Sequence, residues 1–217
     1  MPNGSSSPID IQFRSMIEMN YSHIPKDNRE KIIDNYLSLV ESASGRQSLR
    51  STLDQTTKLI FRLFGFREVS IGLKSREDSF YRYEALFGYR GEVAEKFRRL
   101  KYTYEDMVSK DKYPNIKMGK LSELNPVEGL PKHEKDLFNR PYQLEAARKS
   151  YDEFHEGDYI DVWIYGNSGD LIGWIELSST VDFKLPSKET VRWIELLAAM
   201  LGRIIVQKWA EEDLSRR

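Results

Sequence analysis

The sequence has 217 residues, of which 40% are hydrophobic and 31% are charged, so it is long enough to bury the core of one large domain. Its 33 basic and 34 acidic side chains give a formal net charge of −1, which leaves no basic excess for neutralising nucleic-acid phosphates. The absence of cysteine excludes disulfides, thiolate metal sites and thiol nucleophiles.

The N-terminal part shows neither a signal peptide nor a membrane span. Residues 1–10 are Gly/Ser-rich at their start and predict a flexible leader without a basic or apolar targeting segment. No apolar run approaches the roughly 18 residues that a membrane-spanning helix needs. We therefore expect a cytoplasmic protein with neither nucleic acid nor a membrane as its partner.

Two helices are predicted next. The first runs from about Asn28 to Glu41, and the apolar residues of 9–24 before it could form a further helix that docks on a partner subunit. The second ends near Phe64, where Gly65 is a suitable C-terminal stop.

Strands and an irregular middle follow. Period-2 alternation predicts strands at Val69–Leu73 and Phe80–Phe87, joined as a hairpin. Residues 88–156 predict loops laid over a sheet, with these short elements: helices at Glu92–Leu100 and Gln143–Glu153, and a strand near Ile116–Leu121.

The C-terminal end is the most regular part. It predicts strands at Asp158–Tyr165 and Leu171–Ser178 around a tight turn, then a long helix from Pro186 through Trp209. This element order predicts an α+β fold with a central antiparallel sheet of about five to six strands. The terminal helices should pack on one face, with loops and short helices over the other.

The turn at residues 167–170 predicts how the last two strands pair. With Ser168 and Gly169 as the loop, side chains at opposed positions share a face. One face is then aliphatic and suits packing against helices. The opposed pairs on the other face are Tyr165 with Ile172, Trp163 with Trp174, Asp161 with Glu176, and Tyr159 with Ser178.

This second face is the candidate ligand site, because aromatic walls with a few polar groups are typical of small-molecule pockets. Side chains of the middle segment could instead fill the same space as core. Opposed carboxylates repel, so either an internal arginine or a cationic or hydrogen-bond-donating ligand should compensate them. The candidate ligand-binding residues are Tyr159, Asp161, Trp163, Tyr165, Trp174, Glu176 and, as the internal arginine, Arg82.

Three segments carry a resemblance to GAF domains. The closing hairpin of that family, in which a turn glycine precedes an apolar pair and a second glycine, is similar to residues 167–177 (NSGDLIGWIEL). The long helix that follows it resembles residues 183–205, and the opening helix and strand resemble residues 53–73. The resemblance covers about residues 45–207.

The resemblance implies an antiparallel sheet with a ligand pocket under loops. PAS domains have a related fold, and a PAS-like sensor is therefore the alternative assignment of the fold. It divides the chain into a leader (1–10), a helical extension (11–44), a GAF-like domain (45–209) and a tail (210–217). It also implies a sensory or regulatory role, with a small-molecule ligand, a homodimer or a signalling protein as partner.

Departures from the family narrow that role. Thioether-bound bilins and sulfoxide-reductase activity in this family need cysteines, which this sequence lacks. The cyclic-nucleotide signature is only suggested by Asn139, Lys149 and residues 152–153, because Arg148 stands where a phenylalanine is expected. The sequence does not identify a cofactor.

Catalytic and metal-binding signals are missing. His23, His133 and His155 are widely spaced, so we expect them at the surface, with His155 the nearest to the site. There is no hydrolase carboxylate motif, phosphate loop or nucleophile elbow. The sequence thus favours a non-enzymatic sensor without catalytic residues or a metal. A ligand-free dimerisation domain is the alternative. In a homodimer of either kind, the apolar helix residues left to contact the partner subunit are Ile33, Leu37, Leu197 and Ile204.

Overall fold

The computed structural model describes residues 28–45, 47–131, 134, 137–150 and 152–216. The chain divides into two units, residues 1–35 and 36–217, and helix α2 (Asn28–Ser44) crosses their boundary. This helix confirms the first predicted one, while the expected leader and the segment 9–24 lie outside the described residues. Within these residues, no helix is both long and apolar enough to cross a membrane.

The second unit is built on an antiparallel sheet of six strands in the order β2-β1-β6-β5-β4-β3. This arrangement confirms the predicted α+β class and the sheet of five to six strands. The strands are β1 (Phe66–Lys74), β2 (Tyr81–Phe87), β3 (Ile116–Lys117), β4 (Ser122–Asn125), β5 (Tyr159–Tyr165) and β6 (Leu171–Thr180).

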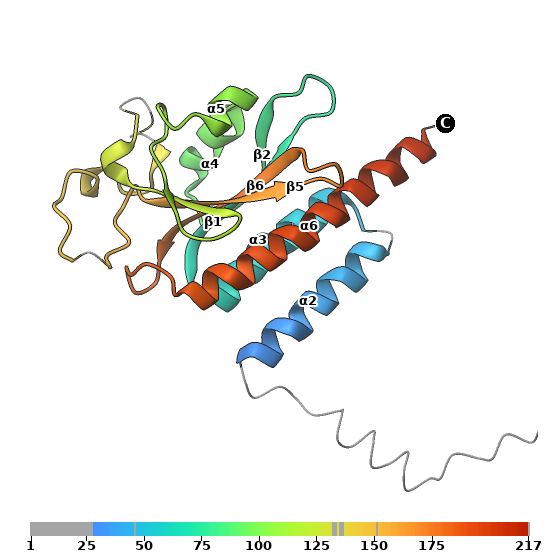
Figure 1. Ribbon diagram of the computed structural model, residues 1–217, viewed down its shortest axis with the longest axis horizontal. Coiled ribbons are helices and arrows are strands. Elements are labelled where there is room, and N and C mark those ends of the chain that lie inside the picture. The colour runs from blue at the N-terminus through green and yellow to red at the C-terminus, as the bar shows by residue number, and fades with distance from the viewer. Residues whose placement is uncertain (1–27, 46, 132–133, 135–136, 151, 217) are drawn as a thin grey trace, which may run out of the picture. The chain divides into compact units, whose positions relative to one another are not determined.

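Two long helices cover one face of the sheet, α3 (Leu49–Phe64) under β1 and β2, and α6 (Lys188–Ser215) under β5 (Figure 1). The Ser48 side chain caps the start of α3, and Gly65 ends it in the left-handed conformation at φ 72°. On this face lie buried aliphatic residues of β5 (Ile160, Val162, Ile164) and β6 (Ile175, Leu177), as the alternation predicts. Leu171, which the alternation places on the same face, packs instead with Trp174 on the opposite one. Members of this core that are fully buried are Ile60, Ile71, Ile160, Ile164, Ile175, Ile194 and Ile205.

The opposite face lies under an irregular cover formed by most of residues 88–157. Its elements are α4 (Gly91–Arg99), α5 (Tyr104–Val108) and the short 3₁₀ helices η1 (Val127–Gly129) and η3 (Pro141–Gln143), and α4 and α5 lie across the sheet from α3 and α6 (Figure 1). An ion pair and a hydrogen bond hold the cover against the sheet. Arg148 pairs with the buried Asp158 at 2.6 Å, and the Asn139 amide donates to the Glu68 carboxylate on β1 at 2.5 Å.

The predicted helix at 143–153 is wrong. The described part of this segment forms turns and bends, in which Leu144 is buried but Ala146 and Ala147 are exposed. One buried position cannot hold an amphipathic helix against the sheet. Instead, Arg148 binds Glu128 and Asp158 and fixes an irregular path.

The predicted strand at 116–121 is shorter than expected, and β4 after it was missed. Glu195 on α6 accepts hydrogen bonds from the Leu121 amide at 2.7 Å and the Ser122 hydroxyl at 2.8 Å. A Cβ on Gly119 would lie 2.1 Å from the Glu195 carboxylate, so the chain turns closely past this side chain. The turn ends β3 and starts β4.

Two expectations about the last helix are corrected. Leu197 and Ile204 are buried and are therefore not spare apolar residues, whereas Leu37 is 58% exposed. Helix α6 also continues to Ser215, beyond the predicted end at Trp209.

Candidate functional site

The β5–β6 hairpin sets the register of the site. Asp161 lies opposite Glu176, Trp163 opposite Trp174, and Tyr159 opposite Ser178, which confirms the predicted pairing. Tyr165 pairs with Leu171 and not with Ile172 as predicted, because a bulge interrupts the ladder between Ile164 and Tyr165. The loop is wider than two residues, since the Gly166 amide donates to the Asp170 carbonyl at 2.8 Å.

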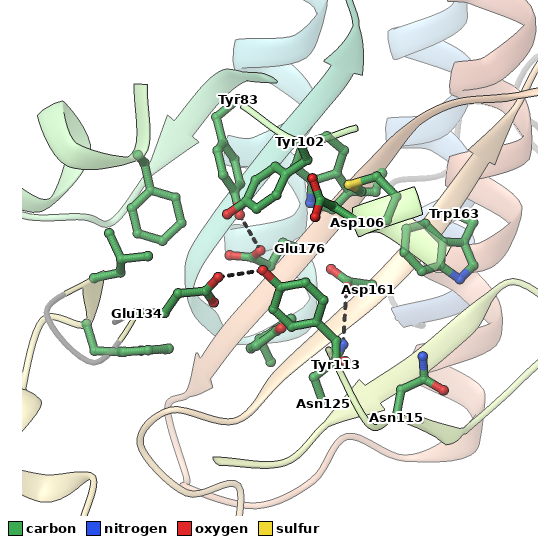
Figure 2. Close-up of a pocket in the computed structure, with 16 residues that line it drawn as sticks. Tyr83, Tyr102, Asp106, Tyr113, Asn115, Asn125, Glu134, Asp161, Trp163 and Glu176 are labelled. Atoms are coloured by element: carbon green, nitrogen blue, oxygen red, sulfur yellow. Dashed lines mark hydrogen bonds between the residues drawn. The ribbon is translucent and has the colours of Figure 1, made fainter. Parts of the chain in front are cut away.

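A cavity of about 50 Å³ lies between this hairpin and the cover (Figure 2). Its floor comes from the sheet and its roof from the segments that follow β2. The lining residues from strands are Tyr83, Asn125, Tyr159, Asp161, Trp163, Trp174 and Glu176, and those from the cover are Phe97, Tyr102, Asp106, Met107, Tyr113, Asn115, Glu134, Leu137 and Phe138.

Five of the seven candidate residues lie on this cavity, and Tyr165 and Arg82 do not. Tyr165 lies beyond the bulge, where it is 41% exposed. The Arg82 guanidinium forms an ion pair with Asp78 and lies over the Phe80 ring at 5.7 Å from its centroid. The expectation that Arg82 compensates the carboxylate pair is therefore wrong.

Aromatic rings fill most of the space above the hairpin. The Trp174 ring centroid lies 5.0 Å from that of Tyr83 and 6.3 Å from that of Tyr102, and Tyr83 packs at 4.7 Å against Phe97. Gly72 on β1 leaves room for Trp174, because an added Cβ would come within 2.0 Å of its ring. Both sequence readings thus hold in part: the face is packed with core side chains, and a small cavity remains among them.

The two opposed carboxyl groups differ in their partners. Glu176 accepts a hydrogen bond from the Tyr83 hydroxyl at 2.7 Å, and its other oxygen lies 3.4 Å from the Tyr89 hydroxyl. Asp161 accepts from the Asn125 amide at 2.9 Å through Oδ2. Its Oδ1 is buried and has no hydrogen-bond partner. Asp161 is thus the less satisfied of the two.

A third carboxyl group, that of Glu134, enters from the cover, where the Tyr113 hydroxyl donates to it. Figure 2 shows the carboxyl groups of Asp161, Glu176 and Glu134 directed into the same space. No lysine or arginine lines the cavity among the described residues. Lys112 near its rim is paired with Asp106 at 2.7 Å. The Asp161–Glu176 pair therefore has no lysine or arginine beside it in the described lining.

Burial and this crowding raise the pKa values of both opposed groups. Desolvation is the main cause of the rise in the pKa of Glu176 from 4.5 to about 7, against the lowering effect of the Tyr83 hydroxyl. Desolvation and then repulsion from Glu176 hold the pKa of Asp161 well above its usual range. The empty site therefore retains a proton near neutral pH.

The chemistry available to the site is acidic and hydrogen-bonding. Its polar groups are carboxyls, tyrosine hydroxyls and the Asn115 and Asn125 amides, with no histidine in the described lining. No group of three His, Asp or Glu side chains suited to a metal ion occurs in the described ranges. Such a site can hold a proton, a cation or a hydrogen-bond donor.

His155 does not lie at the surface as predicted. It is buried, and its Nε2 lies 3.1 Å from the Gln143 carbonyl oxygen, away from the cavity. His23 and His133 lie outside the described residues. The positions that suggested a cyclic-nucleotide signature also lie off the cavity, since Asn139 binds Glu68 and the Lys149 amide donates to Glu153.

Several cavity residues were missed from the sequence. Tyr83 could have been found, because its strand is rich in aromatic residues and shares the alternation used for the hairpin. Tyr102, Tyr113, Asn125 and Glu134 come from loops or from the missed β4. Nothing periodic in their segments pointed to the cavity.

No protein-family model matches the sequence, and no curated protein matches it. The structure is nevertheless similar to solved GAF domains. That of a phosphoenolpyruvate-protein phosphotransferase from Coxiella burnetii is 13% identical, with 86% of this chain and 99% of that chain covered at a TM-score of 0.57.

Two further solved structures extend the likeness. The phycoerythrobilin-bound GAF domain of a cyanobacterial phytochrome is 10% identical (87% and 100% covered, TM-score 0.53). Free methionine-R-sulfoxide reductase from Neisseria meningitidis, in complex with its substrate, is 12% identical (87% and 96% covered, TM-score 0.54). These likenesses show that the chain has the GAF fold, which confirms the resemblance read from the hairpin and the helices that flank the sheet.

Proposed function

We propose that this chain is a non-catalytic sensory or regulatory domain that binds a small molecule in the cavity above the β5–β6 hairpin. The observation that carries the proposal is the Asp161 carboxyl, which is 8% exposed and has an oxygen without a partner in an aromatic-walled cavity. Leaving a buried polar atom unsatisfied costs about 1–3 kcal/mol, so folding alone does not favour it. A ligand that engages this oxygen would recover that cost.

The size of the cavity favours a small ligand. Its 50 Å³ is well below the roughly 150 Å³ of an apolar cavity that binds benzene. A bilin or a nucleotide would need the cover to move far from the sheet. We therefore propose a ligand, or a ligand head group, of only a few non-hydrogen atoms.

A regulatory role is favoured over a catalytic one by the residue types available. The sequence has no cysteine, and the described cavity lining offers neither histidine nor serine as a nucleophile or base. The neighbouring solved structures include both a phytochrome GAF domain and a reductase, so the fold itself permits either role.

Native mass spectrometry of the protein purified from its source tests the proposal. We expect a small molecule that adds mass to the 25.4 kDa chain and is lost in Asp161→Asn. Arg82→Ala is the matched control, because it removes a charge outside the cavity and should retain the added mass. The proposal would be contradicted if every native mass spectrum showed the chain without added mass and no compound of a metabolite library shifted the melting temperature.

We also propose that the domain acts as a helix-mediated homodimer in the cytoplasm and passes its signal to a partner protein. Leu37 and Leu196 are large apolar side chains on helices and are 58% and 47% exposed, which favours a partner surface. Light scattering at tens of micromolar should give twice the 25.4 kDa chain mass. A monomer at that concentration would contradict this part of the proposal.

A ligand-free dimerisation domain is the second candidate. The close ring contacts among Tyr83, Phe97 and Trp174 favour it, because they are those of a packed core. The same two experiments separate the candidates: a dimer without any bound molecule would favour this one.

A further inference from the structure

We propose that the cavity selects a small protonated primary amine, held by its N–H groups against Asp161. This inference rests on the proposed function, namely that the cavity binds a small molecule, and adds the chemical class of that molecule.

The charge of the lining sets the sign of the ligand. Asp161 and Glu176 direct carboxyl groups into one small space, and no lysine or arginine is among the described lining residues (Figure 2). Like charges in a poorly solvated space repel strongly, so an anion is disfavoured. A carboxylate-bearing amino acid is disfavoured for the same reason, because its own carboxylate would lie among these groups.

The hydrogen-bonding pattern requires a donor on that cation. Tyrosine hydroxyls lie within hydrogen-bond distance of both Glu176 oxygens, and Asn125 donates to Asp161 Oδ2. The atom left over is Asp161 Oδ1, which is buried and without a partner. An ammonium N–H would give it a short, charge-assisted bond. A quaternary ammonium cannot, because it has no N–H.

The walls suit an organic cation better than a hydrated metal ion. Tyr83, Tyr102, Trp163 and Trp174 surround the carboxyls, and aromatic faces attract ammonium groups with attached methyl or methylene groups. The described residues also form no group of three ligands suited to a metal ion. The cavity of about 50 Å³ restricts the amine to a short chain or admits only its head.

Proton exchange gives the inference a second signature. Because burial and mutual repulsion keep a proton on the Asp161–Glu176 pair, a bound ammonium should displace that proton. Affinity should then rise with pH through neutrality while the amine stays protonated. The other titratable groups facing this pair from the surrounding elements are Tyr83, Tyr89, Tyr102, Asp106, Tyr113, Glu123, Glu134 and Tyr159.

Isothermal titration of the full chain with methylammonium chloride at constant ionic strength tests the inference. We expect saturable binding, proton release measured as a dependence of the heat on buffer ionisation enthalpy, and at least tenfold weaker binding in Asp161→Asn. Glu176→Gln should also weaken binding and serves if Asp161→Asn misfolds by circular dichroism. Asp78→Asn is the matched control, because it removes one carboxylate far from the cavity and should bind as the wild type does.

Four other probes define the result that overturns the inference. If tetramethylammonium binds as tightly as methylammonium, the site does not recognise an N–H donor. Saturable binding of acetate, methanol or calcium in preference to methylammonium would show that the class is wrong. If no probe binds but native mass spectrometry finds an anionic or neutral molecule, this inference fails and the proposed function stands. If neither experiment finds a bound molecule, both fail.

Discussion

The two faces of the sheet bury the same pair of strands in different ways. On the face covered by α3 and α6, Ile160, Ile164 and Ile175 are fully buried among aliphatic side chains. On the face below the irregular cover, Asp161 and Glu176 alternate with them along the same strands, beside tryptophan and tyrosine rings. One face gains stability from every group that it buries, whereas the other buries charge and leaves an oxygen unsatisfied. This difference is why we propose the ligand site on the acidic face and not on the aliphatic one.

The largest effect is expected on the aliphatic face. Ile175→Ala removes three buried carbons from a fully buried position and should lower the free energy of unfolding by about 2–5 kcal/mol. Ile116→Ala, at a position on β3 that is 58% exposed, is the matched control and should cost less than about 0.5 kcal/mol. Urea titrations measure both, and equal losses would show that the face assignment fails.

The acidic face should make stability depend on pH. The pKa of Glu176 is raised from 4.5 in its ordinary state to about 7 in the folded state, so the folded protein binds this proton more tightly. Its contribution to stability is therefore complete below about pH 4.5 and lost as pH rises to about 7, a loss of about 3 kcal/mol. Urea titrations from pH 4 to pH 8 should show this decline in the wild type and a shallower one in Glu176→Gln, where the raised pKa of Asp161 still contributes.

Glu128 provides the control of opposite sign. Its hydrogen bonds with Arg148 lower its pKa to about 2, so its contribution is present at neutral pH and lost in acid. Glu128→Gln should therefore lower stability at pH 7 and leave the decline due to Glu176 in place. A wild-type profile that rises between pH 5 and pH 8 would contradict the assignment of Glu176.

A smaller effect on stability is expected at Gly72 on β1, which lies against the Trp174 ring. Gly72→Ala would place a methyl group 2.0 Å from the Trp174 ring and force the ring toward the cavity. Overpacking of this kind costs about 1–3 kcal/mol. The urea midpoint should fall and the tryptophan emission should change. Gly91→Ala, where an added Cβ meets nothing within 4 Å, should change neither quantity.

The smallest effect is expected for Arg82→Ala. Arg82 is paired with Asp78 outside the cavity, so its loss should leave the decline of stability between pH 4 and pH 8 unchanged. The same urea series measures it. A steeper decline in Arg82→Ala would mean that this arginine does compensate the carboxylate pair.

The sequence was sufficient for strands β1, β2, β5 and β6, for the helices that flank the sheet and for three opposed pairs of the last hairpin. Those features follow from the alternation of apolar and polar residues and from helix-end signals such as Gly65. Both signals depend only on residues close together in the sequence. The bulge beside Tyr165 was missed because the width of the turn depends on a backbone bond between Gly166 and Asp170. The bulge shifts the pairing of Tyr165 from Ile172 to Leu171, and Tyr165 does not line the cavity.

The cover was beyond sequence reasoning because distant side chains hold it in place. Asn139 is fixed by Glu68 on β1, which precedes it by 71 residues, and Arg140 is fixed by Glu156 and by the Ser179 hydroxyl on β6. No local pattern encodes such contacts. The part of the site on β5 and β6 could therefore be predicted, and the part that comes from β4 and the cover could not.

We propose that the Asp161 carboxyl serves ligand binding and does not stabilise the fold. Replacing it with the neutral isostere asparagine separates these two roles. The free energy of unfolding of wild type and Asp161→Asn should be compared by urea titration at pH 8 without added ligand. We predict that Asp161→Asn is more stable by about 1–3 kcal/mol, because it removes a buried carboxyl group that has an unpartnered oxygen and lies opposite a second carboxyl group. A loss of stability of similar size would contradict the account, since it would mean that the folded protein itself uses this carboxylate.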